Sequence, residues 1–418
     1  MIPALRPRQR WALGLTATVA LGLPDARAAD WPQFHGPRRD NLSTETGLLK
    51  QWPEGGPKLL WTAKGIGHGF SAVAVADGLI YATGNTGPDT LITALDLDGK
   101  VKWTAKNGPA YKREHPGTRS TPTIDGARLY HENADGDVVC LDAKTGKPLW
   151  SLNILQRFRG RNITWGLAES LLVDGNNLIC TPGGEEIGIV ALHKLTGETV
   201  WSAKGIGEKP GYASTILVEH KGLRQIVALM AKALVGVNAD TGELLWRFGH
   251  ETPYDESLFT PLFHDGHIYF ATAHARGSRL LKLNVEGRKS SVELAWSTEK
   301  LDSHHGGVIL LDGCLYGFCH GNYKPRWDCL ELKTGKLMHS LSTPTAGCVT
   351  YADGLIYGMD ERGTVILIKP TPAERVVVSQ FAIPKGGPGP VWAHPVVCGG
   401  RLYLRHSDSL FAYDIQAK

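Results

Sequence analysis

No apolar run in the sequence reaches the roughly 20 residues that a membrane-spanning helix needs. The run Trp11–Leu23 has thirteen residues, follows three arginines and precedes the small-x-small string Ala26-Arg27-Ala28. This pattern predicts a Sec-type signal peptide over residues 1–28. The residue directly after the expected cleavage point is not a cysteine, and the first cysteine of the chain is Cys140. We therefore expect a periplasmic or extracellular protein with no lipid anchor and no membrane insertion after signal cleavage.

The sequence also lacks a large excess of charge of either sign. The chain has 45 lysines and arginines against 41 aspartates and glutamates, and removal of residues 1–28 leaves 41 against 40. There is no long charge run and no low-complexity tract, so no segment is predicted to be disordered. Binding to nucleic acid through counterion release needs a concentrated basic surface. We therefore expect no nucleic-acid partner.

Cysteine shows no metal-binding or haem-binding pattern. The seven cysteines are an odd number, so at least one thiol is unpaired within the chain. They form no CxxC or CxxCH string, and no two are adjacent. Cys140 and Cys329 occupy the same place in the strings Val-Val-Cys-Leu-Asp and Trp-Asp-Cys-Leu-Glu, which predicts buried strand residues. A Cys319–Cys329 bridge across one hairpin is the alternative.

Glycine, in contrast, is abundant, and its spacing is regular. Eight of the fifty glycines follow apolar runs at intervals of 41 to 49 residues, and six of these eight follow an aspartate. Asp-Gly between two β-rich runs predicts a tight hairpin, because glycine accepts positive φ and aspartate bonds its own backbone. The eight positions are Gly78, Gly126, Gly175, Gly222, Gly266, Gly313, Gly354 and Gly400.

A second turn follows most of these glycines by about twenty residues, as in Asp142-Ala143-Lys144-Thr145-Gly146-Lys147-Pro148-Leu149-Trp150. Each unit then holds four strands and two hairpins, which is the period of a β-propeller blade. Blades splay apart toward the rim, so the wedge between outer strands needs large apolar residues. We assign this structural role to Trp103, Trp150, Trp201, Trp246 and Trp296.

The chain ends indicate how the ring closes. Only two strands, Arg401–His406 and Ser409–Ile415, follow the last turn glycine. Lys58–Lys64 has an outer-strand sequence with no hairpin upstream, so we predict that it completes the last blade and leaves no free sheet edge. The expected fold is all-β, an eight-bladed propeller of four antiparallel strands per blade. Seven blades is the alternative, because the units around Gly222 and over 353–383 are irregular.

The Asp-x-x-Thr-Gly-Lys/Glu-x-x-Trp strings resemble the pyrroloquinoline quinone (PQQ) enzyme repeat. That repeat builds the quinoprotein alcohol dehydrogenases, the outer-membrane assembly-factor propellers and many uncharacterised secreted propellers. The resemblance covers residues 59–418, and the box Trp31–Asp40 is similar to the amino-terminal box of the secreted members. The predicted organisation is a signal peptide over 1–28, an extension over 29–58 that packs on the propeller, and the propeller over 59–418.

Polar and aromatic residues precede several of the innermost strands. Loops that enter these strands converge on the mouth of the central channel, so we expect residues five to nine positions before each first turn to lie near one another. A histidine near a carboxylate can act as general base, an arginine can hold an anion, and tryptophans can stack on a cofactor. The candidate catalytic residues are Glu169, His305, His394 and Arg119, and the candidate stacking residues are Trp165 and Trp392.

Three functions are compatible with this ring of residues. The first is a monomeric binding module whose funnel takes a small molecule or an extracytoplasmic protein and needs no cofactor. The second, and the first candidate if the protein is an enzyme, is a PQQ-dependent alcohol or sugar dehydrogenase. The third is a hydrolase or lyase that uses the His/Glu/Arg cluster. No ligand spacing singles out a metal site.

The resemblance implies what the second function would require. The quinoprotein dehydrogenases hold the quinone against a tryptophan floor, the alcohol dehydrogenases also with a disulfide of two adjacent cysteines, and they bind Ca²⁺ through acidic and amide side chains. Trp165 or Trp392 is a candidate floor and Glu169 a candidate calcium ligand. Adjacent cysteines and a clear Glu/Asn/Asp set are missing from this sequence.

Overall fold

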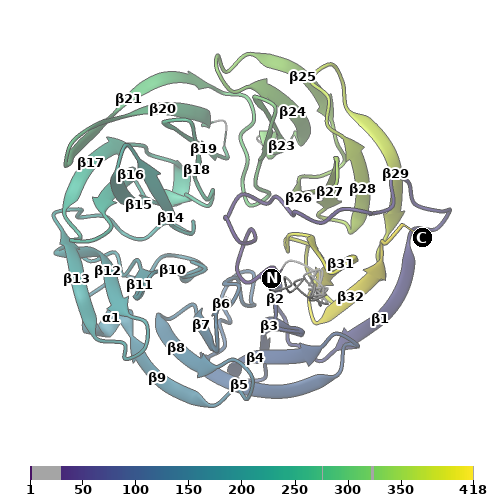
Figure 1. Cartoon of the computed structure of the whole chain (residues 1–418), viewed down its shortest axis with the longest axis horizontal. Helices are drawn as coiled ribbons and strands as arrows, with labels where there is room; N and C mark the ends of the chain where they lie inside the picture. The colour runs from purple at the N-terminus through teal and green to yellow at the C-terminus, as the bar shows by residue number, and fades with distance from the viewer. Residues whose placement is uncertain (2–29, 275, 322–323, 418) are drawn as a thin grey trace.

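The computed structural model describes residues 1, 30–274, 276–321 and 324–417. Eight four-stranded antiparallel sheets stand around a central axis in these residues (Figure 1). The prediction of an eight-bladed propeller is therefore confirmed, and the seven-bladed alternative is wrong. Helix is confined, in the described part of the chain, to α1 (Ile154–Arg157) and the 3₁₀ turn η1 (Pro253–Asp255).

The first four blades follow one another along the chain. Blade 1 has β2 (Ala74–Ala76), β3 (Leu79–Thr86), β4 (Asp89–Asp96) and β5 (Val101–Pro109). Blade 2 has β6 (Thr123–Asp125), β7 (Arg128–Glu132), β8 (Asp137–Asp142) and β9 (Pro148–Asn153). Blade 3 has β10 (Leu172–Asp174), β11 (Asn177–Cys180), β12 (Ile187–His193) and β13 (Thr199–Lys204). Blade 4 has β14 (Ile216–His220), β15 (Leu223–Leu229), β16 (Ala233–Asn238) and β17 (Leu244–Gly249).

The other four blades continue around the ring. Blade 5 has β18 (Leu262–His264), β19 (His267–Thr272), β20 (Gly277–Glu286) and β21 (Lys289–Thr298). Blade 6 has β22 (Ile309–Leu311), β23 (Cys314–Cys319), β24 (Arg326–Glu331) and β25 (Leu337–Ser342). Blade 7 has β26 (Gly347–Ala352), β27 (Leu355–Asp360), β28 (Thr364–Lys369) and β29 (Val376–Ala382). Blade 8 has β30 (Val396–Cys398), β31 (Arg401–His406), β32 (Ser409–Asp414) and β1 (Lys58–Lys64).

The first hairpin of a blade shows why aspartate and glycine recur there. Asp77 and Gly78 join β2 to β3, and both have positive φ, 49° and 76°. This is the geometry of a two-residue hairpin turn whose twist matches that of the strands. Glycine adopts it without strain, and aspartate tolerates it better than most residues.

The ring closes as the chain ends predicted. β1 pairs antiparallel with β32, with Lys64 opposite Ser409 and Lys58 opposite Asp414 (Figure 1). The amino-terminal strand thereby supplies the outer strand of the last blade. Cys319 and Cys329 are both free thiols, so the alternative of a bridge between them is not formed.

Outer-strand tryptophans connect successive blades. The indole N–H of Trp201 on β13 donates to the carbonyl of Ala239 in blade 4 at 2.9 Å. Its ring covers Gly242, where an added Cβ would lie 2.5 Å from the indole. Four more tryptophans make the same hydrogen bond to the next blade, at 2.8 to 3.1 Å: Trp61, Trp103, Trp150 and Trp296.

The segment after residue 30 crosses the channel before it reaches β1 (Figure 1). Trp31 exchanges two backbone hydrogen bonds of 2.8 Å with Val75 on β2, and the N–H of Ser43 donates to Tyr351 on β26 at 2.8 Å. The segment thus spans from blade 1 to blade 7. Residues 2–28 of the predicted signal peptide lie outside the described residues. Among the residues that are described, no helix has the length and apolar character needed to cross a bilayer.

Candidate functional site

A cavity of about 370 Å³ lies at the mouth of the central channel. Apart from Phe34, its lining comes from loops that lead into an innermost strand and from loops that follow a second strand. These two kinds of loop open on the same face because adjacent strands are antiparallel. The lining residues are Phe34, Phe70, His115, Arg119, Trp165, Ala168, Ser170, Tyr212, Ser214, Glu256, Leu258, His274, His304, His305, His320, Glu361, Trp392 and His394.

Five of the six predicted site residues line this cavity: Arg119, Trp165, His305, Trp392 and His394. The sixth, Glu169, does not. It is 2% exposed, and its Oε2 accepts hydrogen bonds from the backbone N–H and the hydroxyl of Thr181, at 3.0 and 2.7 Å. Burial raises the pKa of Glu169 to about 7, although Thr181 and Arg39 act in the opposite direction. Glu169 belongs to the interior below the cavity.

The amino-terminal box closes the channel beneath the cavity. Arg39 is 3% exposed; its guanidinium donates to the carbonyls of Thr215, at 2.9 Å, and Leu171. Phe34 lines the cavity, and its ring stacks on that of His35 with centroids 3.7 Å apart. The buried Arg39 thus ties this segment to the loops before β10 and β14.

Arg119 places a positive charge in the cavity wall. Its guanidinium carbon lies 4.8 Å from the ring centre of Tyr111 and 5.8 Å from that of Phe70. It donates to the carbonyls of Gly117 and His115 at 3.2 and 2.8 Å. No carboxylate of the described residues forms an ion pair with it. Burial lowers the pKa of Arg119, but an arginine remains charged at neutral pH.

The two tryptophans are held by carboxylates. Trp392 Nε1 donates to Glu361 Oε1 at 2.9 Å, and Trp165 Nε1 donates to Glu114 Oε2 at 3.1 Å. The Trp392 ring lies among other rings, with centroids 4.7 Å from Phe70 and 5.4 Å from His305. Each indole is therefore oriented by a hydrogen bond at its edge.

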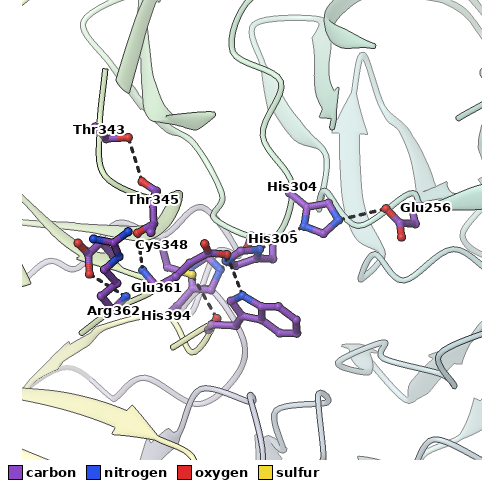
Figure 2. Close-up of polar contacts among 11 residues, drawn as sticks. Glu256, His304, His305, Thr343, Thr345, Cys348, Glu361, Arg362 and His394 are labelled. Atoms are coloured by element: carbon purple, nitrogen blue, oxygen red, sulfur yellow. Dashed lines mark hydrogen bonds and ion pairs between the residues drawn. The ribbon is translucent and has the colours of Figure 1, made fainter. Parts of the chain in front are cut away.

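The predicted histidines His305 and His394 are neighbours in the cavity wall (Figure 2). His394 Nε2 donates to the backbone carbonyl of His305 at 2.8 Å, and burial lowers the pKa of His394 to about 4. Burial and the nearby His304 and His394 lower the pKa of His305 well below its usual value. Both rings are thus neutral at physiological pH, and His394 ties the loop before β30 to the loop before β22.

A second group on the cavity wall contains Glu256, His274 and His304. Glu256 Oε2 lies 2.5 Å from His274 Nε2 and 3.3 Å from His304 Nε2 (Figure 2 shows the latter). Burial acts to raise the pKa of Glu256, but the hydrogen bonds and charges of the two histidines outweigh it, and the pKa is lowered. The His320 ring lies nearby, with its centroid 5.1 Å from that of His274.

The sequence analysis missed His274 and His320, and it did not select Glu256, although this residue lies nine positions before Asp265. Both histidines follow the second strand of their blades, His274 two residues after β19 and His320 one residue after β23. Only loops that enter innermost strands were considered. A histidine in the same place of two successive repeats is a signal that would have found them.

The calcium–quinone pair that the repeat implies does not fit this lining. Ca²⁺ takes about six to eight oxygen ligands. Among the described lining residues the carboxylates are Glu256 and Glu361, one held by two histidines and the other by Trp392. Aspartate, asparagine and glutamine are missing from that lining, and imidazoles supply most of the donor atoms. A disulfide of adjacent cysteines cannot form, because no two cysteines are adjacent in the sequence.

Comparison with known sequences places the chain among the PQQ-repeat proteins. The family PQQ_2, described as outer membrane protein assembly factor BamB, matches residues 42–186 and 112–340. BamB of Yersinia pestis is 22% identical over 261 residues, 59% of this chain and 63% of its own length. A 1-butanol dehydrogenase (cytochrome c) of Thauera butanivorans is 27% identical over 228 residues, 50% of this chain and 30% of its own. The chain thus spans less than two thirds of either relative.

Solved structures show the same architecture. BamB from Moraxella catarrhalis superposes with a TM-score of 0.60 at 14% identity, over 86% of this chain and all of that one. Quinohemoprotein alcohol dehydrogenase from Comamonas testosteroni superposes with a TM-score of 0.65 at 13% identity, over 93% of this chain and 81% of that one. Likeness at this identity shows the fold alone. The matched sequence stretches run from residue 42 to residue 340, and the chain belongs to this PQQ-repeat family of β-propellers.

Proposed function

We propose that the protein is a binding module whose central cavity holds a small planar anion, and that it acts outside the cytoplasm. Arg119 carries this proposal. It is a guanidinium in an aromatic cavity wall, and no carboxylate of the described residues neutralises it. Two of its five N–H groups donate to backbone carbonyls, so three remain for a ligand.

The aromatic residues define the shape of the ligand. Phe70 lies beside Arg119, and the Trp392 ring packs on Phe70 with centroids 4.7 Å apart. Trp165 and Tyr212 lie together with centroids 5.9 Å apart. A planar ring can stack on such surfaces while a carboxylate accepts from the guanidinium. The cavity volume of about 370 Å³ suits a small molecule. Aromatic carboxylates are therefore the ligand class that we propose.

The alternatives have less support in the lining. A quinoprotein dehydrogenase needs oxygen ligands for Ca²⁺, and the described lining offers imidazoles instead. A hydrolase that uses Glu169 needs that carboxylate in the cavity, whereas it is bonded to Thr181 below it. Binding requires only the cation and the rings that the cavity presents. The expectation of export continues to depend on the sequence of residues 1–28.

Calorimetric titration with benzoate, phthalate and indole-3-carboxylate tests the proposal, with the corresponding neutral amides as comparison ligands. We expect at least one carboxylate to bind and its amide to bind more weakly. Arg119→Gln removes the charge and is expected to weaken binding by roughly 10- to 100-fold, since a hydrogen bond to a charged group contributes about 1.5–3 kcal/mol.

Arg38→Gln is the matched control, because the Arg38 side chain is 60% exposed and pairs with Asp40 on the surface. It should bind the carboxylate as the unchanged protein does. Failure of every carboxylate to bind, equal binding of the amides, or unchanged binding by Arg119→Gln would each contradict the proposal.

A further inference from the structure

Imidazole and carboxylate groups from three loops meet on the wall of the cavity formed by blades 5 and 6. Glu256 precedes β18, His274 lies between β19 and β20, and His304 precedes β22. All three line the cavity, and their side chains are 13 to 20% exposed. The group is thus largely withdrawn from water but open toward any molecule in the cavity.

The positions of the donor atoms suit a single ion. One ligand atom from each of the three residues lies within 4.8 Å of the other two. In a tetrahedral zinc site with bonds near 2.0–2.1 Å, ligand atoms are roughly 3.3 Å apart. The Glu256 Oε2 to His304 Nε2 distance is already 3.3 Å, and that to His274 Nε2 is 2.5 Å. Small side-chain shifts would place all three around one centre.

The donor chemistry selects the class of ion. Two imidazole nitrogens and one carboxylate oxygen suit a divalent transition metal, whereas Ca²⁺ and Mg²⁺ prefer all-oxygen sites. We propose that Glu256, His274 and His304 form a binding site for a divalent transition-metal ion such as Zn²⁺. Three protein ligands leave a coordination position free, and the residues face the cavity.

Neighbouring groups support this arrangement. His304 Nδ1 lies 3.3 Å from His305 Nδ1, so His305 can fix the ring orientation of His304, as second-layer partners of metal ligands do. The His320 ring lies beside the three proposed ligands, with its centroid 5.4 Å from that of His304. The metal site goes beyond the proposed function, because Zn²⁺ binding needs no organic ligand. It also uses a part of the cavity wall that does not include Arg119.

The test is titration of the full, chelator-stripped protein with ZnCl₂ by calorimetry, together with the visible absorption of bound Co²⁺. We expect one ion per chain and the intense ligand-field bands of a low-symmetry Co²⁺ site. Glu256→Gln, His304→Ala and His274→Asn should each weaken Zn²⁺ binding by about 10- to 100-fold or more, since loss of even an outer-layer partner has an effect of this size.

His115→Asn is the matched control for His274→Asn. Both histidines line the cavity and both have positive φ, 50° and 59°, which asparagine tolerates. His115→Asn should bind Zn²⁺ normally. Melting temperatures in the presence of chelator verify that each variant is folded. The Co²⁺ spectrum is measured on the unchanged protein, so it tests the site even where a variant does not fold.

Absence of stoichiometric Zn²⁺ binding and of Co²⁺ bands in the unchanged protein would overturn the inference. Equal affinity in folded Glu256→Gln, His304→Ala and His274→Asn would overturn it as well. A failure of aromatic carboxylates to bind, with Zn²⁺ binding intact, would remove the proposed function and leave the metal site standing.

Discussion

Five of the eight joints between neighbouring blades are alike at the rim of the propeller, whereas the loops at its centre differ from blade to blade. In each of these five joints a tryptophan N–H donates to a carbonyl of the next blade, and the ring covers a turn glycine there. At the centre, equivalent loops carry Arg119, Trp165, Glu256, His304 and Trp392. The rim repeats one packing solution, and the centre varies because each loop adds a different group to one cavity.

The joint between blades 4 and 5 shows what the rim interaction needs. Trp246 donates to Gln225 Oε1 of its own blade at 2.8 Å, and its ring lies against Gly236. In blade 5, β20 and β21 are ten residues each and connect at Glu286–Lys289, without the Thr-Gly turn. The hydrogen bond to the next blade therefore depends on the Thr-Gly turn, whereas Trp246 is still buried in the apolar cluster of blades 4 to 6.

The largest effect on stability is expected from a change at the rim. Trp201→Ala removes an indole that is 7% exposed and leaves the Ala239 carbonyl without its donor. We expect a loss of about 3–5 kcal/mol in the free energy of unfolding, measured by chemical denaturation with far-UV circular dichroism. Trp201→Phe keeps most of the ring and should lose about 1–2 kcal/mol. A smaller loss of unfolding free energy in Trp201→Ala than in Trp201→Phe would contradict the role of this tryptophan in joining the blades.

A somewhat smaller effect is expected from the floor of the cavity. Arg39→Ala removes two hydrogen bonds to blade carbonyls and the positive charge near Glu169. The expected loss is about 2–4 kcal/mol in the same denaturation experiment, because buried acceptors and a buried acid lose their partner. Arg38→Ala, at the exposed neighbour, should be nearly neutral. Equal stability of the two variants would show that the amino-terminal box is not anchored by Arg39.

The smallest and pH-dependent effect is expected at Glu169. Burial raises its pKa from 4.5 to about 7, so between these pH values the unfolded chain releases a proton that the folded chain keeps. The contribution of Glu169 to stability is therefore full below about pH 4.5 and is lost as the pH rises through 7. Glu169→Gln should match the unchanged protein near pH 4.5 and exceed it by about 1–3 kcal/mol at pH 8.

Melting temperature as a function of pH measures this difference, and Glu186→Gln on the surface provides the control. A constant difference between Glu169→Gln and the unchanged protein across the pH range would show that Glu169 is not a buried acid with a raised pKa.

The fold was predictable because its signals are local and repeated. Asp77-Gly78 encodes a turn by its backbone preferences alone, and the Thr-Gly strings mark the second hairpin of several blades. β1 was predictable because its sequence matches an outer strand without a hairpin before it. Trp246 was assigned to the wedge with the other tryptophans, and its different partner depends on a turn in the next blade.

The site was only partly predictable, since position along a strand does not determine which way a side chain points. Glu169 and His394 each lie five residues before a turn residue, Asp174 and Gly399, yet His394 lines the cavity and Glu169 does not. The box Trp31–Asp40 was expected to pack across the propeller. That it inserts Phe34 and Arg39 into the channel depends on tertiary packing that no local pattern encodes.

The difference between rim and centre is tested most directly by measuring stability and ligand binding together in Arg119→Gln and Trp201→Phe. Arg119 bonds only carbonyls of its own loop, so Arg119→Gln should keep its melting temperature and lose about 10-fold or more in affinity for the aromatic carboxylate. Trp201→Phe should melt at a lower temperature and bind the carboxylate unchanged. If affinity instead follows melting temperature in both variants, the cavity is part of the structural core and the account is contradicted.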